Sequence, residues 1–92
     1  MEIGMTIKKL RKKRGLTQKK LAEMSGISSN ALCSIETGKS FISKETMKAI
    51  SRSLQVPPGY ILFAAISDED IPKEKLPIFK ALREPILNCF DV

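Results

Sequence analysis

Histidine is absent from this chain of 92 residues, and only two cysteines, Cys33 and Cys89, are present. Structural zinc sites use about four Cys or His ligands, and histidine is the most common general base in enzymes. Neither chemistry has the residues it needs. We therefore expect no metal site, no cofactor and no catalytic residue. A disulfide between the two cysteines is disfavoured in a reducing compartment, and Cys33 is interpreted as a small filler side chain.

Long apolar runs and aromatic residues are also scarce. No stretch reaches the length of about 18 apolar residues that a membrane span needs, and the N-terminal MEIGMTIKKL lacks the pattern of a secretory signal. We therefore expect a soluble, cytoplasmic protein. Tyr60 and four phenylalanines are the only aromatic residues, so aliphatic side chains must dominate the core of one small domain.

Positive charge is abundant and unevenly distributed. Residues 1–40 carry nine lysines and arginines against three acidic residues, whereas residues 67–92 carry four against six. A basic first half favours a polyanionic partner, either nucleic acid or an anionic membrane, and a merely solvated surface is the alternative.

Apolar residues recur at helical spacing, and no segment alternates with period two, so we predict an all-α fold. Five helices are expected in the first part of the chain: one over about 4–14, one capped by Thr17, one capped by Ser28 or Ser29, one capped by Ser43, and one over 59–66. The connector 67–75 is polar and acidic. Beyond it, Pro77 and Pro85 predict one or two short amphipathic helices, with a kink or break at Pro85.

The stretch from Thr17 to Lys39 predicts two short helices that cross steeply around a turn at Gly26. Their inner faces are expected to be apolar, with Met24 turned inward and Ala31 at the close-packed edge: Leu21, Ala22, Met24, Ile27, Ala31, Leu32 and Ile35. The outer face of the second of these helices has unusually short polar side chains: Ser28, Ser29, Asn30 and Ser34. Such groups suit the major groove of DNA, where Asn can pair with adenine and Ser with several base edges.

The stretch LTQKKLAEMSGISSNALCSIETGKS resembles the helix-turn-helix of the phage repressor and Cro-like (XRE) family of bacterial transcription regulators, and the resemblance extends over residues 5–63. It implies a compact five-helix lambda-repressor-like DNA-binding domain over 1–66 and a short helical C-terminal extension over 67–92. Ile42 and Lys44 depart from the family pattern, in which Pro and an apolar residue are common at these positions.

The resemblance also implies roles for individual residues. Gln18 and Lys39 match contacts to DNA phosphates, and Arg11 and Glu36 match a structural ion pair between the first and third helices. The base-contacting positions match the polar face already described: Ser28, Ser29, Asn30 and Ser34.

The function implied is sequence-specific binding of double-stranded DNA by a transcriptional repressor, as a homodimer on a palindromic operator with the third helix in the major groove. Phe79, Leu82 and Ile86, together with the helix over 59–66, are the expected dimer surface; a tail that folds back to enlarge the core is the alternative. An antitoxin that binds a toxin protein and represses its own operon, or a restriction–modification controller protein, would share the DNA chemistry. An RNA-binding or membrane-surface module would use the charge without needing the short polar face. The family implies a cytoplasmic protein of bacterial or phage origin, associated with the nucleoid when bound to DNA.

Overall fold

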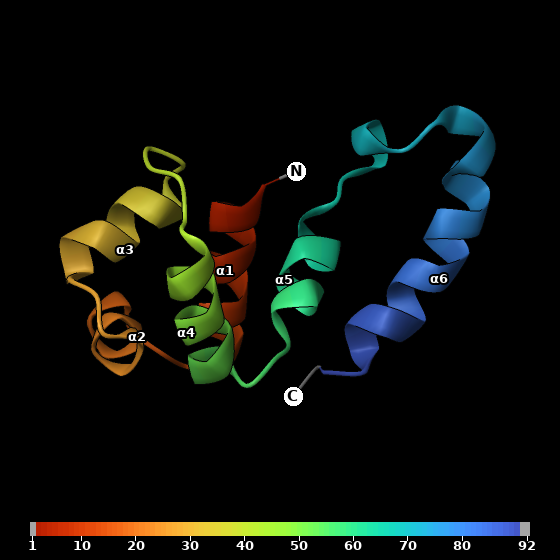
Figure 1. Ribbon diagram of the computed structural model, residues 1–92. Helices are drawn as coiled ribbons and strands as arrows, with labels where there is room; N and C mark the ends of the chain where they lie inside the picture. The colour runs from red at the N-terminus through yellow and green to blue at the C-terminus, as the bar shows by residue number, and fades with distance from the viewer. Residues whose placement is uncertain (1, 91–92) are drawn as a thin grey trace.

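The computed structural model describes residues 2–90, and these contain six α-helices, two single-turn 3₁₀ helices and no strand (Figure 1). The all-α prediction is confirmed. The helices are α1 (Ile3–Lys13), α2 (Gln18–Ser25), α3 (Ser29–Glu36), α4 (Lys44–Leu54), α5 (Pro58–Ala65) and α6 (Leu76–Asn88), with η1 (Asp68–Asp70) and η2 (Lys73–Lys75) between the last two. Among residues 2–90, no helix is long and apolar enough to cross a membrane.

Hydroxyl side chains cap the N-termini of three of the helices. The side chains of Thr17, Ser28 and Ser43 each accept a hydrogen bond from the backbone N–H of the third residue beyond them. Each bond satisfies one of the donors that a helix start leaves without a partner. Ser28, rather than Ser29, is therefore the cap of α3. Gly26 ends α2 in the left-handed conformation, with φ of 71°, which lets the chain turn sharply into α3.

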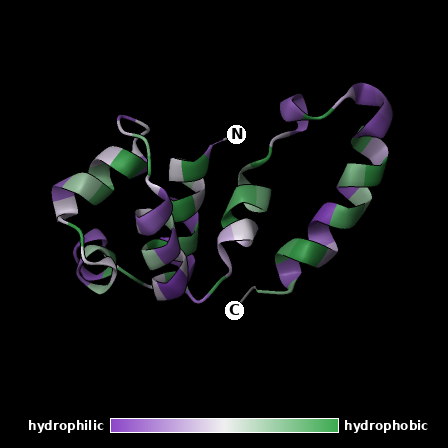
Figure 2. Ribbon diagram, in the orientation of Figure 1, coloured by the Kyte–Doolittle hydropathy of each residue, from purple (hydrophilic) through white to green (hydrophobic). Residues whose placement is uncertain are grey.

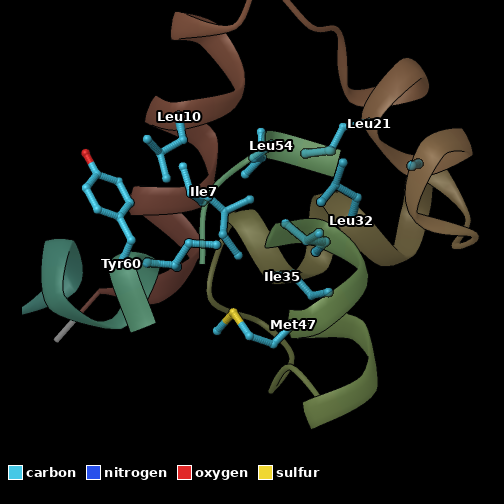
Figure 3. Packing of buried hydrophobic residues seen from close by; sticks show 12 residues of the cluster. Ile7, Leu10, Leu21, Leu32, Ile35, Met47, Leu54 and Tyr60 are labelled. Atoms are coloured by element: carbon cyan, nitrogen blue, oxygen red, sulfur yellow. The ribbon is translucent and has the colours of Figure 1, made fainter. Parts of the chain in front are cut away.

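The core is formed by the inner faces of α1 to α5 (Figure 3). Its fully buried aliphatic side chains come from all five helices: Ile7, Leu21, Leu32, Ile50, Leu54 and Ile61. The predictions for Met24 and Ala31 are wrong, because Met24 is 46% exposed and Ala31 lies on the exposed side of α3. The buried residues of α2 are Leu21, Ala22 and Ser25, which leaves Met24 at the edge of the packed face.

Helices α1 and α3 approach so closely that only glycine fits at one position of α1. A β-carbon added at Gly4 would collide with the backbone carbonyl oxygen of Ile35, near the end of α3. Backbone atoms cannot move aside without shifting the helix. Gly4 therefore sets the distance between the first helix and the helix that carries the polar face.

The C-terminal segment forms one helix, α6, that continues through Pro85, so of the one or two helices predicted the structure has one. Helix α6 lies beside α5, at the opposite end of the molecule from α3 (Figure 1). The phenol of Tyr60 donates a hydrogen bond of 2.9 Å to the carbonyl oxygen of Leu87, and its ring meets that of Phe90 edge to face at 5.1 Å. Phe79 packs against Phe63 at 5.5 Å.

Helix α6 nevertheless adds little to the core, since none of its residues is buried. Three of its apolar side chains remain in contact with solvent: Ile78, Leu82 and Ile86. Figure 2 shows the alternation of apolar and polar residues along this helix. Because Phe79 faces α5, it does not belong to the exposed face where we expected it, and Ile78 occupies that face instead.

Candidate nucleic-acid interface

Helix α3 has an apolar inner face and a short polar outer face. Leu32 and Ile35 are buried, whereas Ser29 and Asn30 are exposed and Ser34 is half-buried. A helix whose buried side chains fix it to the core, and whose solvent side has only short side chains, can approach another surface closely. Such a helix fits the width of the major groove of B-DNA.

Ser28 is exposed, and its side chain also caps the start of α3. Its hydroxyl oxygen accepts a hydrogen bond of 3.0 Å from the backbone N–H of Ala31. The hydroxyl hydrogen remains a donor, so capping of α3 and a contact to an acceptor on a base edge are compatible. Of the four polar positions predicted on this face, Ser28 is the one whose side chain also holds the helix in shape.

Beneath α3, Arg11 and Glu36 form a buried ion pair with two-point geometry. Arg11 Nε donates to Glu36 Oε2 at 2.8 Å, and Nη2 donates to Oε1 at 3.2 Å. The side chains are only 9% and 1% exposed. Arg11 Nη1 also donates to the carbonyl oxygen of Leu16 at 2.9 Å. Because the planar guanidinium fork constrains direction as well as distance, the pair fixes the end of α3 against α1.

Gln18 belongs to the same network. Its amide Nε2 donates to Glu36 Oε1 at 3.0 Å, so the residue predicted as a phosphate contact also connects α2 to the buried carboxylate. The side chain is only half-buried, and an amide nitrogen has a second hydrogen to donate. The geometry therefore leaves Gln18 able to donate to a phosphate at the start of α2 while its first hydrogen remains on Glu36.

Lys39 follows directly after Gly38, which has φ of 78° and ends the turn beyond α3. The backbone N–H of Lys39 donates to the carbonyl oxygen of Ser34 at 2.9 Å. This bond holds the start of the loop against the helix, while the lysine side chain extends into solvent. The ammonium group is therefore attached at a fixed point beside the polar face of α3.

A shallow hollow of about 380 Å³ lies next to α3, between this helix and the start of α4. Asn30 and Ser34 line it together with Phe41 from the α3–α4 loop. Phe41 is fully exposed, and the sequence analysis did not single it out. The signal available was a phenylalanine directly after Gly-Lys-Ser, in a polar loop that shows no helical periodicity.

The fold and the exposed helix define a class of protein, the helix-turn-helix DNA-binding domains. Residues 7–61 match the model of a helix-turn-helix family. The chain therefore belongs to this family, whose members are DNA-binding transcriptional regulators, as the resemblance to phage repressors predicted.

One curated relative is the immunity repressor protein of Bacillus phage phi105, which is 35% identical over 75 residues, or 82% of this chain. The chain spans about half the length of that relative, 49%. Among solved structures, the clp gene regulator ClgR from Corynebacterium glutamicum matches with a TM-score of 0.68 over 96% of this chain and 85% of that one. At 22% sequence identity, this second likeness concerns the fold.

Proposed function

We propose that the protein is a transcriptional repressor that binds a palindromic operator as a homodimer, with α3 in the major groove. The proposal rests on the outer face of α3. This face has short polar side chains, and the buried Arg11–Glu36 pair holds the helix in place. The likeness to a phage immunity repressor supports the direction of regulation.

In this proposal, some residues contact DNA bases and others contact phosphates. The side chains on α3 and at its cap contact base edges: Ser28, Ser29, Asn30 and Ser34. Gln18 and Lys39 contact phosphates on either side of the polar face. Phosphate contacts fix the position of the protein, whereas contacts to base edges supply the preference for sequence.

A single helix contacts only a few base pairs, so modules of this kind pair across half-sites about 34–36 Å apart. The exposed apolar face of α6, made of Ile78, Leu82 and Ile86, is the surface we propose for pairing. On helix α5, which we also expected at the dimer surface, Leu62 is 41% exposed.

Selection from random double-stranded DNA with the purified protein tests the proposal. We expect enrichment of a palindrome whose half-sites lie one helical turn apart. Enrichment of an asymmetric sequence would remove the dimer from the proposal, and recovery of unselected sequence would remove specific DNA binding.

The same exposed face of α6 favours one second candidate, an antitoxin whose tail binds a toxin protein. Sedimentation of the isolated full chain separates the two. A dimer at micromolar concentration supports self-pairing through α6, whereas a monomer that still selects a single half-site favours a different protein as the occupant of that face.

A further inference from the structure

Phe41 is the most exposed large hydrophobic side chain within residues 2–90, at 103% of its reference area. A phenylalanine held fully in water contributes nothing to the core. A single exposed apolar side chain is common, whereas an apolar patch rimmed by polar groups marks a surface that binds something. The fold therefore does not account for Phe41, and its surroundings must.

Those surroundings place Phe41 beside the face of α3 proposed to meet DNA. Figure 1 shows the α3–α4 loop rising next to the C-terminal end of α3. The hollow described above is lined by Phe41 together with Asn30 and Ser34. Ala31, whose methyl group is exposed between those two polar residues along the helix, lines it as well.

The hollow thus combines apolar and polar groups in one place. Phe41 and Ala31 supply exposed apolar carbon, and Asn30 supplies an amide that both donates and accepts. Thymine presents a matching pair of features in the major groove, a C5-methyl group beside an O4 acceptor, and apolar contact with that methyl group distinguishes thymine from cytosine.

We propose that Phe41 and Ala31 form a contact site for the C5-methyl group of a thymine, next to the base contacted by Asn30. This assignment rests on the proposed function, because it needs α3 in the major groove. It adds a residue from outside α3 to the set that determines sequence preference, and it gives the exposed phenylalanine a binding partner of defined chemistry.

A protein partner is the competing occupant. On its other side Phe41 borders a second hollow, of about 470 Å³, to which α1 contributes Met5 with 48% exposure. That hollow is lined by the apolar Ile3 and Ile42 as well as by Glu2, Thr37 and Ser40, so it could hold an apolar partner. The presence of Asn30 and Ser34 in the first hollow favours DNA.

The test uses the selected operator and replaces each thymine in turn by deoxyuridine, which removes the methyl group and leaves O4 in place. For the wild-type protein we expect one position in each half-site at which the replacement weakens binding about fourfold, the value for one buried methyl-sized group. For Phe41→Ala we expect weaker binding to the unmodified operator and no further effect of deoxyuridine at that position. Met24→Ala, an exposed apolar side chain on α2, is the matched control and should keep the wild-type sensitivity.

Each other outcome has a distinct meaning. A wild-type protein that selects an operator but is insensitive to deoxyuridine everywhere overturns the methyl contact and leaves the proposed function standing. If Phe41→Ala weakens binding to the operator and to unrelated DNA equally, Phe41 contacts the sugar–phosphate backbone. That result also overturns the methyl contact. Loss of self-association by both Phe41→Ala and Met5→Ala, with methyl sensitivity unchanged, assigns the loop to a protein surface. If the wild-type protein selects no sequence at all, the proposed function itself fails.

Discussion

Asn30 and Glu36 belong to the same eight-residue helix, yet Asn30 is exposed and Glu36 is 6% exposed. A side chain without a partner in the protein can be replaced at little cost to folding. A buried carboxylate that accepts hydrogen bonds from Arg11 and Gln18 cannot. Substitution at the two positions should therefore separate binding from stability.

Asn30→Ala should weaken binding to the selected operator by about 1–3 kcal/mol and relax the preference at one base position, because an amide can pair with a base edge at two points. Binding measured against a set of single-base operator variants checks this. The thermal unfolding of Asn30→Ala should match that of the wild type. Unchanged affinity for all variants would exclude Asn30 from the base contacts.

Glu36→Met should destabilise the fold by about 3–5 kcal/mol, because it leaves the Arg11 guanidinium buried without its counter-charge. Denaturant unfolding of the single and double variants measures this. The double variant Arg11→Met/Glu36→Met should be less destabilised than either single variant, since no charge is then left uncompensated. Losses that simply add would show that the two side chains do not act as a pair.

Among the elements, the helix starts follow most directly from sequence. Thr17 and Ser43 were predicted as caps, and both accept the expected backbone hydrogen bond. Capping depends on residues within one turn, so the information is local. The orientation of Met24 depends on neighbours distant in sequence, and the prediction that it turns inward was wrong. For the tail, the sequence left one or two helices open, and the structure has one, which includes Pro85.

The attachment of α6 involves a carboxylate in the connector. Arg83 Nη2 donates to Asp68 Oδ1 at 2.5 Å, and Lys80 lies 3.6 Å from Oδ2. The hydrogen bond from Arg83 is the main cause that holds the pKa of Asp68 below its usual 3.8. A depressed pKa means that the folded state favours the charged form, so this contribution is fully present above about pH 3.8 and is lost as pH falls through the folded pKa.

Acidification should therefore loosen α6 before the core of α1 to α5 unfolds. We expect amide hydrogen exchange in α6 to accelerate as pH falls below about 3.8, measured relative to core amides after correction for the intrinsic rate. In Asp68→Asn, α6 should already exchange faster at pH 5 and depend less on pH. The hydrogen bond from the Ser67 backbone also holds the pKa of Asp70 low. Asp70→Asn is therefore the matched control, because it removes a carboxylate with a lowered pKa from the same connector and leaves the contact between Asp68 and Arg83 in place. Equal pH dependence in wild type and Asp68→Asn would contradict this role for Asp68.

Over the whole molecule, the polar face of α3 and the exposed apolar face of α6 lie at opposite ends. The structure is elongated, with extents of 42 × 27 × 19 Å, and α6 lies farthest from α3 (Figure 1). This separation lets a second copy pair through α6 without covering the polar face of α3. It also makes pairing testable without altering the DNA-facing residues.

Leu82→Asp should convert the proposed dimer to a monomer, because a carboxylate would be desolvated in the middle of an apolar interface. Sedimentation of the variant measures its mass, and binding to a half-site and to the full palindrome measures the consequence. We expect near wild-type affinity for the half-site and loss of the additional affinity for the palindrome. Ala81→Asp, which adds the same carboxylate at an exposed position of this helix outside the face of Ile78, Leu82 and Ile86, is the control. A dimeric Leu82→Asp protein would exclude α6 as the pairing surface.

The sequence by itself determined the all-α fold, the helix caps and membership of the helix-turn-helix family, because periodicity, capping and turn residues act over a few positions. Only the tertiary structure decided that Gln18 shares the buried carboxylate of Glu36, that Phe79 faces α5, and that Phe41 stands in solvent beside Asn30 and Ser34. Each of these facts depends on which helices and loops pack together, and no local pattern of residues encodes that packing. The stretch from Thr17 to Lys39 gives the polar face of α3, while the loop beyond it gives the aromatic group that completes the proposed surface.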